Sequence, residues 1–254
     1  MINPALAGLI EKWLKAGILD TTGMVIHPVT GTPQGGIVSP ILANVYLYYV
    51  LDLWFEKVVK PRCKGEVYLC RYADDFVVLF QSEREANWFY QELPKRLEKF
   101  GLELSPEKSH ILSFSKYRID ENNRFDFLGL EYHWGYDRKH QPCIKRRTSR
   151  QKLYKSMVAV NQWCRENRFL PVWKLFKQLN VKLRGYYNYF GVIGNYDSLQ
   201  LFFYQLERTL FKWLNRRSQR RSYNWNKYNK LTKKYRLLRP RITERRNYQL
   251  KLAF

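Results

Sequence analysis

Apolar residues in the first part of the chain follow two different spacings. A spacing of three to four residues predicts helices over residues 1–17, 39–60 and 83–100. Short apolar runs, several of them rich in β-branched and aromatic residues, predict strands instead. These runs are Val67–Cys70, Phe76–Phe80, Leu102–Leu104, Ile111–Phe114 and Phe125–Tyr132. Helices and strands in this order predict an antiparallel sheet that is backed by helices on one face.

The pattern changes after Gly135. Residues 142–150 are interpreted as a basic linker, and helical spacing beyond it predicts three or four amphipathic helices. Their expected positions are near 149–166, 171–184, 197–217 and 225–235. We therefore predict an α+β protein with two domains. Residues 1–136 would contain the sheet, and residues 137–254 would form an all-α bundle with a basic outer surface.

The distribution of charge sharpens this division. The chain has 254 residues, of which 45% are hydrophobic, and a formal net charge of +23, so it is large and apolar enough to fold around a core. Residues 1–136 contain 15 Lys and Arg against 17 Asp and Glu, whereas residues 137–254 contain 30 against five. A solvated charged face would normally carry acids as well. The imbalance therefore predicts a polyanionic partner for the C-terminal part, and nucleic acid fits best.

Several classes of protein are disfavoured by composition. No apolar run approaches the roughly 18 residues that span a bilayer, and no secretory leader opens the sequence, so no membrane partner is expected. The four cysteines are scattered without the spacing of a zinc site or a disulfide framework: Cys63, Cys70, Cys143 and Cys164. This usage is typical of a reduced compartment, and we expect a cytoplasmic protein.

The most informative stretch is Arg71-Tyr72-Ala73-Asp74-Asp75-Phe76, which lies between two predicted strands. The connection is short enough to require a tight hairpin with two carboxylates side by side at its tip. Adjacent like charges are unfavourable unless a cation or a proton lies between them. An ordinary surface turn is the alternative, since Asp is a common turn residue.

A set of ordered motifs resembles the palm of a reverse transcriptase. They are TPQGGIVSP at 32–40, YADD at 72–75, Lys108 after a Gly-Leu-x-Leu strand, and FLG at 127–129. Further along, KLRGYYNYFG at 182–191, Lys212-Trp213 and RRSQRR at 216–221 resemble the thumb of bacterial group II intron reverse transcriptase/maturases. The resemblance covers nearly all of the chain. It implies a partial polymerase palm followed by an all-α basic thumb bundle.

The resemblance also implies roles for individual residues in RNA-directed DNA synthesis by two-metal nucleotidyl transfer. Asp74 would be a ligand of Mg²⁺ and Asp75 its neighbour with a supporting role, because carboxylates hold two ions about 3.5–4 Å apart in such sites. Lys108 would neutralise or protonate the pyrophosphate leaving group.

Other matched positions would bind substrates. Nucleotide and template contacts are expected at Gln34, Gly35, Gly36, Tyr72 and Ala73. Here glycines permit close approach of a nucleotide, Gln34 offers a donor and an acceptor, and Tyr72 would lie under the primer end. Phe127, Leu128 and Gly129 resemble the primer grip. Alternatively, the glycines form an ordinary turn and the apolar residues an ordinary core strand.

The basic C-terminal part is expected to bind RNA, as a structured intron or a template, and an RNA/DNA primer duplex, with dNTPs as the small substrates. Cations interleaved with aromatic residues can neutralise phosphates and stack on unpaired bases. The residues that we predict to bind nucleic acid are Arg146, Arg147, Lys182, Arg184, Arg216, Arg217, Arg220 and Arg221.

One departure from the family pattern affects the expected activity. Reverse transcriptases of this type place a strand with another metal-binding Asp before the Gln-Gly loop, but only 31 residues precede Thr32. We therefore expect the two-ion site to be incomplete, and the isolated chain to be weak or inactive. The chain would be half of a split enzyme with an N-terminal fingers and palm partner chain, a truncated product, or a non-catalytic splicing cofactor of the maturase type.

Overall fold

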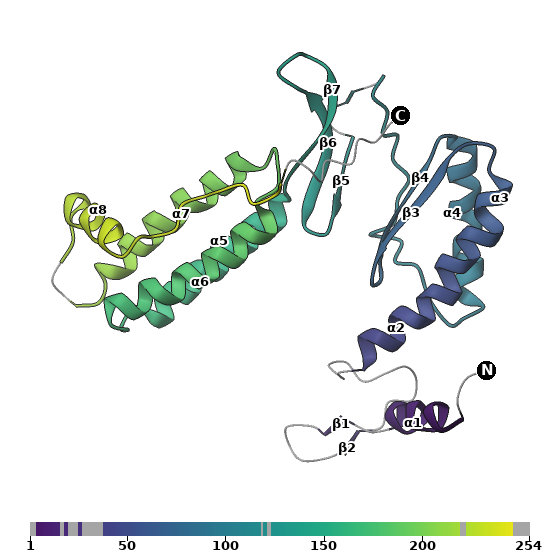
Figure 1. Ribbon diagram of the computed structural model, residues 1–254, viewed down its shortest axis with the longest axis horizontal. Coiled ribbons are helices and arrows are strands. Elements are labelled where there is room, and N and C mark those ends of the chain that lie inside the picture. The colour runs from purple at the N-terminus through teal and green to yellow at the C-terminus, as the bar shows by residue number, and fades with distance from the viewer. Residues whose placement is uncertain are drawn as a thin grey trace. The chain divides into compact units, whose positions relative to one another are not determined.

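A computed structural model describes residues 4–15, 18–19, 25–26, 38–117, 119–120, 123–218 and 222–245 (Figure 1). The chain forms two compact units that divide between Ile111 and Leu112. Five of the predicted site residues lie outside the described residues. They are Gln34, Gly35, Gly36, Arg220 and Arg221.

The first unit contains helices and a β-hairpin. It begins with α1 (Pro4–Lys15) and the short antiparallel pair β1 (Ile18–Leu19) and β2 (Val25–Ile26). A long helix follows, made of α2 (Ser39–Leu47), the π-helical turns η1 (Tyr48–Asp52) and η2 (Phe55–Val59), and α3 (Lys60–Arg62). The hairpin of β3 (Val67–Tyr72) and β4 (Asp75–Phe80) leads into α4 (Glu83–Glu98).

The core of the first unit lies where the long helix and α4 cover one face of this hairpin. Apolar spacing along both helices supplies the buried side chains, and alternation along the strands supplies the rest. Fully or almost fully buried are Val50, Leu51, Phe55 and Val59 of the long helix, Val67 of β3, and Phe89, Leu93 and Leu97 of α4. The predicted helices at 39–60 and 83–100 and the predicted hairpin are thus confirmed.

Two predicted strands are wrong. Leu102–Leu104 and Ile111–Phe114 pair with no strand among the described residues. Leu102 and Leu104 pack against the core of the first unit without belonging to a helix or strand. Phe114 instead contacts the rings of Phe125 and Trp134, with centroids 5.3 and 5.5 Å away. Contacts with apolar side chains, and not strand pairing, account for Leu102, Leu104 and Phe114, whereas Ile111 is exposed.

The second unit begins with an antiparallel three-stranded sheet of β5 (Arg124–Phe127), β6 (Leu130–Tyr136) and β7 (Pro142–Thr148). The single strand predicted at Phe125–Tyr132 is wrong, because the chain turns back at Leu128 and Gly129, which have φ angles of 52° and 74°. The basic linker predicted at 142–150 is also wrong. Its first seven residues pair with β6 as β7, because strand pairing overrides the low strand propensity of its charged residues.

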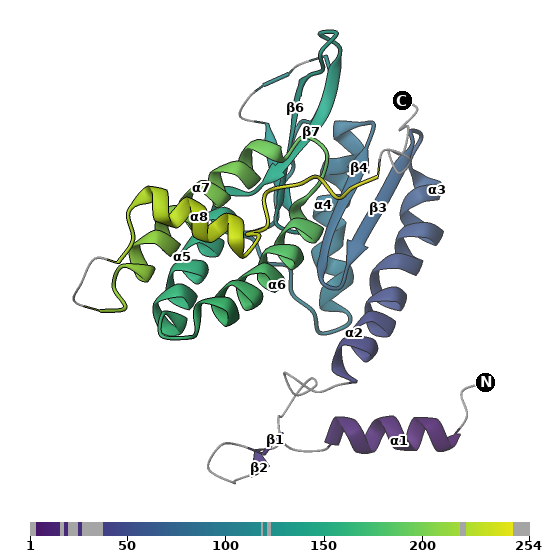
Figure 2. The ribbon, with the colours of Figure 1, turned by 60° about the vertical axis from the view of Figure 1, so that its left-hand side comes forward.

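Four helices complete the second unit: α5 (Arg150–Asn167), α6 (Val172–Phe190), α7 (Tyr196–Leu214) and α8 (Trp225–Lys234) (Figure 2). They confirm the predicted amphipathic helices. Their inward faces form one core, whose largest fully buried side chains include Phe176, Tyr187 and Tyr228. The α+β fold class is confirmed. No helix within the described ranges is both long and apolar enough to cross a membrane.

The sheet of the second unit is joined to its helices by a buried amide. Asn195 is fully buried, accepts a 2.7 Å hydrogen bond from the Thr148 backbone N–H, and donates to the Thr148 hydroxyl and to the Phe190 carbonyl. This connection helps to make the three strands and the four helices one compact unit. The boundary between compact units therefore precedes the predicted division at residues 136 and 137, which remains a prediction about functional domains.

Candidate active site

The two acidic residues lie at the turn of the β3–β4 hairpin. Tyr72 pairs with Asp75 across the hairpin, so the connecting loop consists of Ala73 and Asp74 only. The sequence predicted both carboxylates at the tip; in the structure Asp74 occupies the loop and Asp75 begins β4. Both residues are exposed. The two carboxylates are therefore neighbours that can be reached from solvent.

Alternation along the hairpin gives its two faces different characters. Val67, Leu69 and Arg71 point toward the helices, whereas Tyr72, which is 66% exposed, lies on the outer face. Asp75 is the cross-strand partner of Tyr72 and therefore lies on this outer face as well. The structure thus brings together three of the predicted site residues: Tyr72, Asp74 and Asp75.

Arg71 connects the hairpin turn to the long helix. Its Nε and Nη2 donate to the two carboxylate oxygens of Asp52 at 2.7 and 2.6 Å. Its Nη1 donates to Asn44 Oδ1 at 3.0 Å and to the carbonyl oxygen of Ala73 at 2.8 Å. The hydrogen bonds to Asp52 raise the pKa of Arg71 above its ordinary high value, so the guanidinium stays charged.

Sequence reasoning missed Arg71, Asp52 and Asn44 as parts of this site. The available signal was weak but physical: Asp52 is the one acid in the apolar run 48–55, and Arg71 occupies an inward position of a strand. A charge on an apolar face normally requires a partner. The pairing of these two residues, 19 positions apart, depends on how the hairpin packs on the helix, which periodicity does not specify.

The donor set at the turn suits a hard cation. Carboxylate oxygens are the ligands that Mg²⁺ prefers, and an exposed pair leaves room for substrate phosphates. Among the described residues, no group of three or more His, Cys, Asp or Glu is arranged to hold a metal ion. Asp74 and Asp75 thus fit part of a magnesium site, and further ligands would have to come from elsewhere.

Lys108 belongs to the same unit as the hairpin. It lies in a turn at residues 106–108, where its backbone N–H donates to the Ser105 carbonyl at 3.2 Å, and its side chain is exposed. Because its side chain is exposed, Lys108 can reorient to contact a phosphate of a bound substrate. Its predicted role at the leaving group stays a prediction.

The predicted primer-grip residues lie at another tight hairpin among the described residues. Phe127 pairs with Leu130, so Leu128 and Gly129 alone make the turn between β5 and β6. The Gly129 carbonyl accepts a 3.0 Å hydrogen bond from the Ser149 N–H, and the Leu128 carbonyl accepts one of 2.9 Å from the Tyr189 hydroxyl. These residues belong to the second unit, and their predicted role is not tested by the fold of that unit.

Two of the predicted nucleic-acid-binding arginines have carboxylate partners. Arg146 Nη2 donates to both oxygens of Glu244 at 2.9 and 2.7 Å, and Arg147 Nε donates to the buried Glu131 at 2.8 Å. Burial opposes ionisation of Glu244, but hydrogen bonds from the Ile193 N–H and from Arg146 outweigh it and lower the pKa of Glu244. Both arginines therefore already stabilise the fold, and binding of phosphate there would compete with these ion pairs.

The other predicted nucleic-acid-binding residues that the structure describes make contacts of other kinds. Lys182 lies 5.5 Å from the centroid of Trp163, and Arg216 lies 5.5 Å from that of Trp213. Arg217 donates to the Leu170 carbonyl at 2.8 Å, and Arg184 is exposed on α6. Cations placed beside aromatic rings are common where proteins contact unpaired bases.

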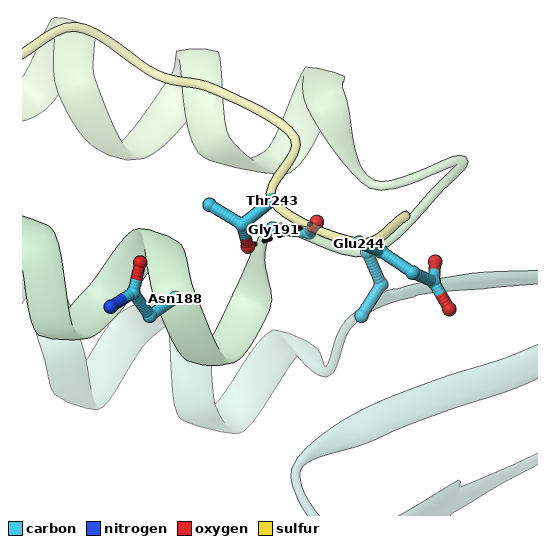
Figure 3. Close-up of a pocket in the computed structure, with 5 residues that line it drawn as sticks. Asn188, Gly191, Thr243 and Glu244 are labelled. Carbon is cyan, nitrogen blue, oxygen red and sulfur yellow. Dashed lines mark hydrogen bonds between the residues drawn. The ribbon is translucent and has the colours of Figure 1, made fainter. Parts of the chain in front are cut away.

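A shallow pocket in the second unit contains none of the predicted site residues. It is lined by Asn188, Gly191, Val192, Thr243 and Glu244, where the C-terminal segment crosses the end of α6 (Figure 3). There the Thr243 and Glu244 N–H groups donate to the Gly191 carbonyl at 2.8 and 3.0 Å. The pocket therefore reflects the docking of this segment, and the hairpin turn remains the better candidate for chemistry.

The chain combines a hairpin that carries two adjacent carboxylates with a strongly basic helical unit. This combination is typical of proteins that act on nucleic acid. The comparison with protein families agrees. The family described as reverse transcriptase (RNA-dependent DNA polymerase) matches residues 2–132, and the group II intron maturase-specific domain matches residues 151–231. The chain belongs to the reverse transcriptase family, in its group II intron reverse transcriptase/maturase branch, which confirms the resemblance.

Individual relatives are similar over parts of their length. Group II intron-encoded protein LtrA of Lactococcus lactis subsp. cremoris is 25% identical, over 80% of this chain and 46% of LtrA. Protein YkfC of Escherichia coli is 28% identical, over 48% of this chain and 37% of YkfC. A 91 kDa protein in the cob intron of Schizosaccharomyces pombe is 52% identical over 50 residues, which are 20% of this chain and 6% of that protein. The chain thus spans about half the length of LtrA.

Proposed function

We propose that this chain supplies the carboxylate hairpin and the thumb of an RNA-directed DNA polymerase. The reaction is attack of a primer 3′-hydroxyl on the α-phosphate of a dNTP, which forms a new P–O bond and releases pyrophosphate. The observation that carries the proposal is the pair Asp74 and Asp75, held at a two-residue turn beside Tyr72 on the outer face of the hairpin.

The residues of the chain have separate tasks in this reaction. Reverse transcriptases generally use Mg²⁺, which stabilises the developing negative charge when it is bound. Asp74 and Asp75 would hold it through carboxylate oxygens. Tyr72 would support the primer end, and Lys108 would neutralise or protonate the departing pyrophosphate. Ala73, together with Gln34, Gly35 and Gly36, would contact the nucleotide and template, and Phe127, Leu128 and Gly129 would hold the primer strand.

Primer extension on an RNA template tests the proposal. The assay compares the chain alone with the chain supplemented by an N-terminal fingers and palm fragment, since the family pattern includes another Asp before the Gln-Gly loop. We expect weak or no extension alone and clear extension with the fragment. Asp74→Asn should then reduce synthesis by at least about 100-fold, because loss of a metal ligand removes several kcal/mol of transition-state stabilisation. Synthesis that is indifferent to Asp74→Asn would contradict the assignment.

A second function is favoured by the maturase-specific match at 151–231 and by the scarcity of acids in the basic part. The helical unit would bind structured intron RNA and assist its splicing without metal chemistry. If six to ten phosphates are engaged, log K should fall against log salt with a slope of roughly −4 to −9.

The double substitution Asp74→Asn and Asp75→Asn separates the two functions. It should abolish synthesis and leave RNA affinity and splicing assistance unchanged. Loss of splicing in a folded double variant would show that the hairpin is needed for both. The proposed partners are accordingly RNA, an RNA/DNA primer duplex, dNTPs and an N-terminal palm segment, and we propose the cytoplasm as the compartment.

A further inference from the structure

The backbone at the carboxylate turn is strained. Ala73 has a φ of 54°, in the left-handed region, where a side chain is unfavourable. Such a conformation costs on the order of 1–3 kcal/mol and persists only where the surroundings enforce it. Ala73 immediately precedes Asp74. A group that fixes the peptide between them therefore also fixes the position of the Asp74 backbone, from which the carboxylate extends.

The guanidinium of Arg71 is the group that holds this peptide. It uses four of its five N–H donors, two on Asp52, one on Asn44 and one on the Ala73 carbonyl. The Arg71 side chain is only 11% exposed and that of Asp52 26% exposed, so solvent weakens this ion pair less than it would an exposed one. A lysine has no planar fork and cannot satisfy the carboxylate and the turn together.

Apolar packing also docks the hairpin on the helix. The core joins them through apolar side chains, because Leu51 and Phe55 of the helix and Val67 of the hairpin belong to one cluster, against which Phe76 packs. A partly buried ion pair is also a poor source of stability, because desolvation offsets much of the attraction. The hydrogen bonds of Arg71 instead link the long helix to the tip of the hairpin, beyond the apolar core. The π-helical turn η1 ends at Asp52, and such turns are concentrated at functional sites.

We propose that Arg71 is a positioning residue, which, anchored by Asp52 and Asn44, fixes the Ala73 peptide and thereby aims Asp74 at a divalent cation. This inference rests on the proposed function, in which Asp74 and Asp75 hold Mg²⁺. It adds three residues of this chain to the site, none of which touches the metal or the substrate. Residues that orient metal ligands typically change metal affinity 10- to 100-fold when they are altered.

The test uses two readouts on the full chain. The first is the NMR order parameter of the Ala73 and Asp74 backbone, measured without metal. The second is the dissociation constant for Mn²⁺, measured with the N-terminal fingers and palm fragment present and followed by electron paramagnetic resonance. In Arg71→Lys the order parameter should fall from a rigid value to below about 0.6, and the Mn²⁺ dissociation constant should rise about tenfold or more. An unchanged order parameter in a folded Arg71→Lys chain would overturn the inference.

Two further variants separate positioning from simple stability. Arg96→Lys alters a guanidinium that donates to the Tyr49 and Val50 carbonyls of the same long helix, and it should leave both readouts unchanged. The exchange Arg71→Asp with Asp52→Arg rebuilds the ion pair, but a carboxylate at position 71 cannot donate to the Ala73 carbonyl. It should restore the melting temperature while the turn stays mobile. A rigid turn in the exchanged variant, or a mobile one in Arg96→Lys, would count against a specific role for the Arg71 hydrogen bond.

The same measurements distinguish failure of the inference from failure of the proposed function. Asp74→Asn should abolish Mn²⁺ binding while the turn stays rigid. If the wild-type chain does not bind Mn²⁺ even with the N-terminal fragment present, or if Asp74→Asn binds it unchanged, the proposed metal site is wrong, and the order parameters still decide whether Arg71 fixes the turn. If Asp74→Asn abolishes binding and Arg71→Lys changes neither readout, only the positioning role is wrong.

Discussion

Two hairpins in the described part of the chain have two-residue loops, the same form and very different surroundings. Each has a two-residue loop whose first residue, Ala73 or Leu128, adopts a left-handed φ without being glycine. The first turn is held by one charged side chain and presents carboxylates to solvent. The second turn is held by a backbone N–H and a tyrosine hydroxyl, and its own residues are apolar and half-buried.

The difference concerns what each support contributes. A guanidinium fork sets direction at the first turn, where ionisable groups need a defined geometry. The second turn is continuous with a buried polar network, because Leu130, directly after Gly129, pairs with Thr148, which Asn195 holds. We therefore expect changes around the second hairpin to act mainly on stability, and changes around the first to act mainly on the order of the turn.

The largest effect on stability is expected for Asn195→Ala. It would leave the Thr148 N–H and the Phe190 carbonyl, both buried, without their present partner. Each unsatisfied buried group costs about 1–3 kcal/mol, so we expect a loss of about 3 kcal/mol in the free energy of unfolding of the second unit. Urea denaturation followed by circular dichroism measures it.

The control for this variant is Asn180→Ala. Asn180 anchors the C-terminal segment through the Arg236 carbonyl and the Leu238 N–H, but it is only half-buried, so water can replace these bonds. A loss of about 1 kcal/mol is expected there. Equal losses in both variants would mean that burial of the Asn195 network is not what stabilises the second hairpin.

Much of this arrangement follows from local sequence, and the reasons are visible in single elements. Helical spacing correctly predicted the helices, and in α4, α6 and α7 the apolar positions form one buried face. The carboxylate hairpin was predicted from two β-forming runs with five residues between them. β7 was missed because Lys145, Arg146 and Arg147 hide its alternation, and only pairing with β6 makes that segment a strand.

The side-chain contacts that hold the two turns could not be predicted from the sequence. Arg71 meets Asp52, Tyr189 meets the Leu128 carbonyl 61 positions away, and Asn195 meets Thr148 47 positions away. Each pairing depends on the angle at which two elements pack, and a periodic pattern identifies a face but not its partner. The turn at Leu128 was missed for a related reason, since apolar alternation continues on both sides of it.

Exchanging glycine and alanine sharpens the comparison of the two turns. Gly129 has a φ of 74°, so Gly129→Ala should destabilise the second unit by about 1–2 kcal/mol. Ala73→Gly removes the same kind of strain from the first turn and gains freedom in the unfolded chain. It should therefore change stability by less than about 1 kcal/mol. The two chains are compared by urea denaturation. A large loss of stability in Ala73→Gly would mean that the alanine methyl is itself needed at the turn.

The smallest effect is expected for Tyr189→Phe, which removes only the hydroxyl that donates to the Leu128 carbonyl. The ring stays in place against Phe190, whose centroid lies 4.7 Å away. Because Tyr189 is 57% exposed, water can take over the carbonyl, and the loss should be about 0.5–1 kcal/mol. Tyr196→Phe is the matched control, since that hydroxyl only accepts a 3.4 Å bond from Gln200. If Tyr189→Phe is no more destabilising than this control, the second turn is held by the Ser149 N–H alone, and the two turns then differ in the group that donates to the loop carbonyl, a guanidinium in the first and a backbone N–H in the second.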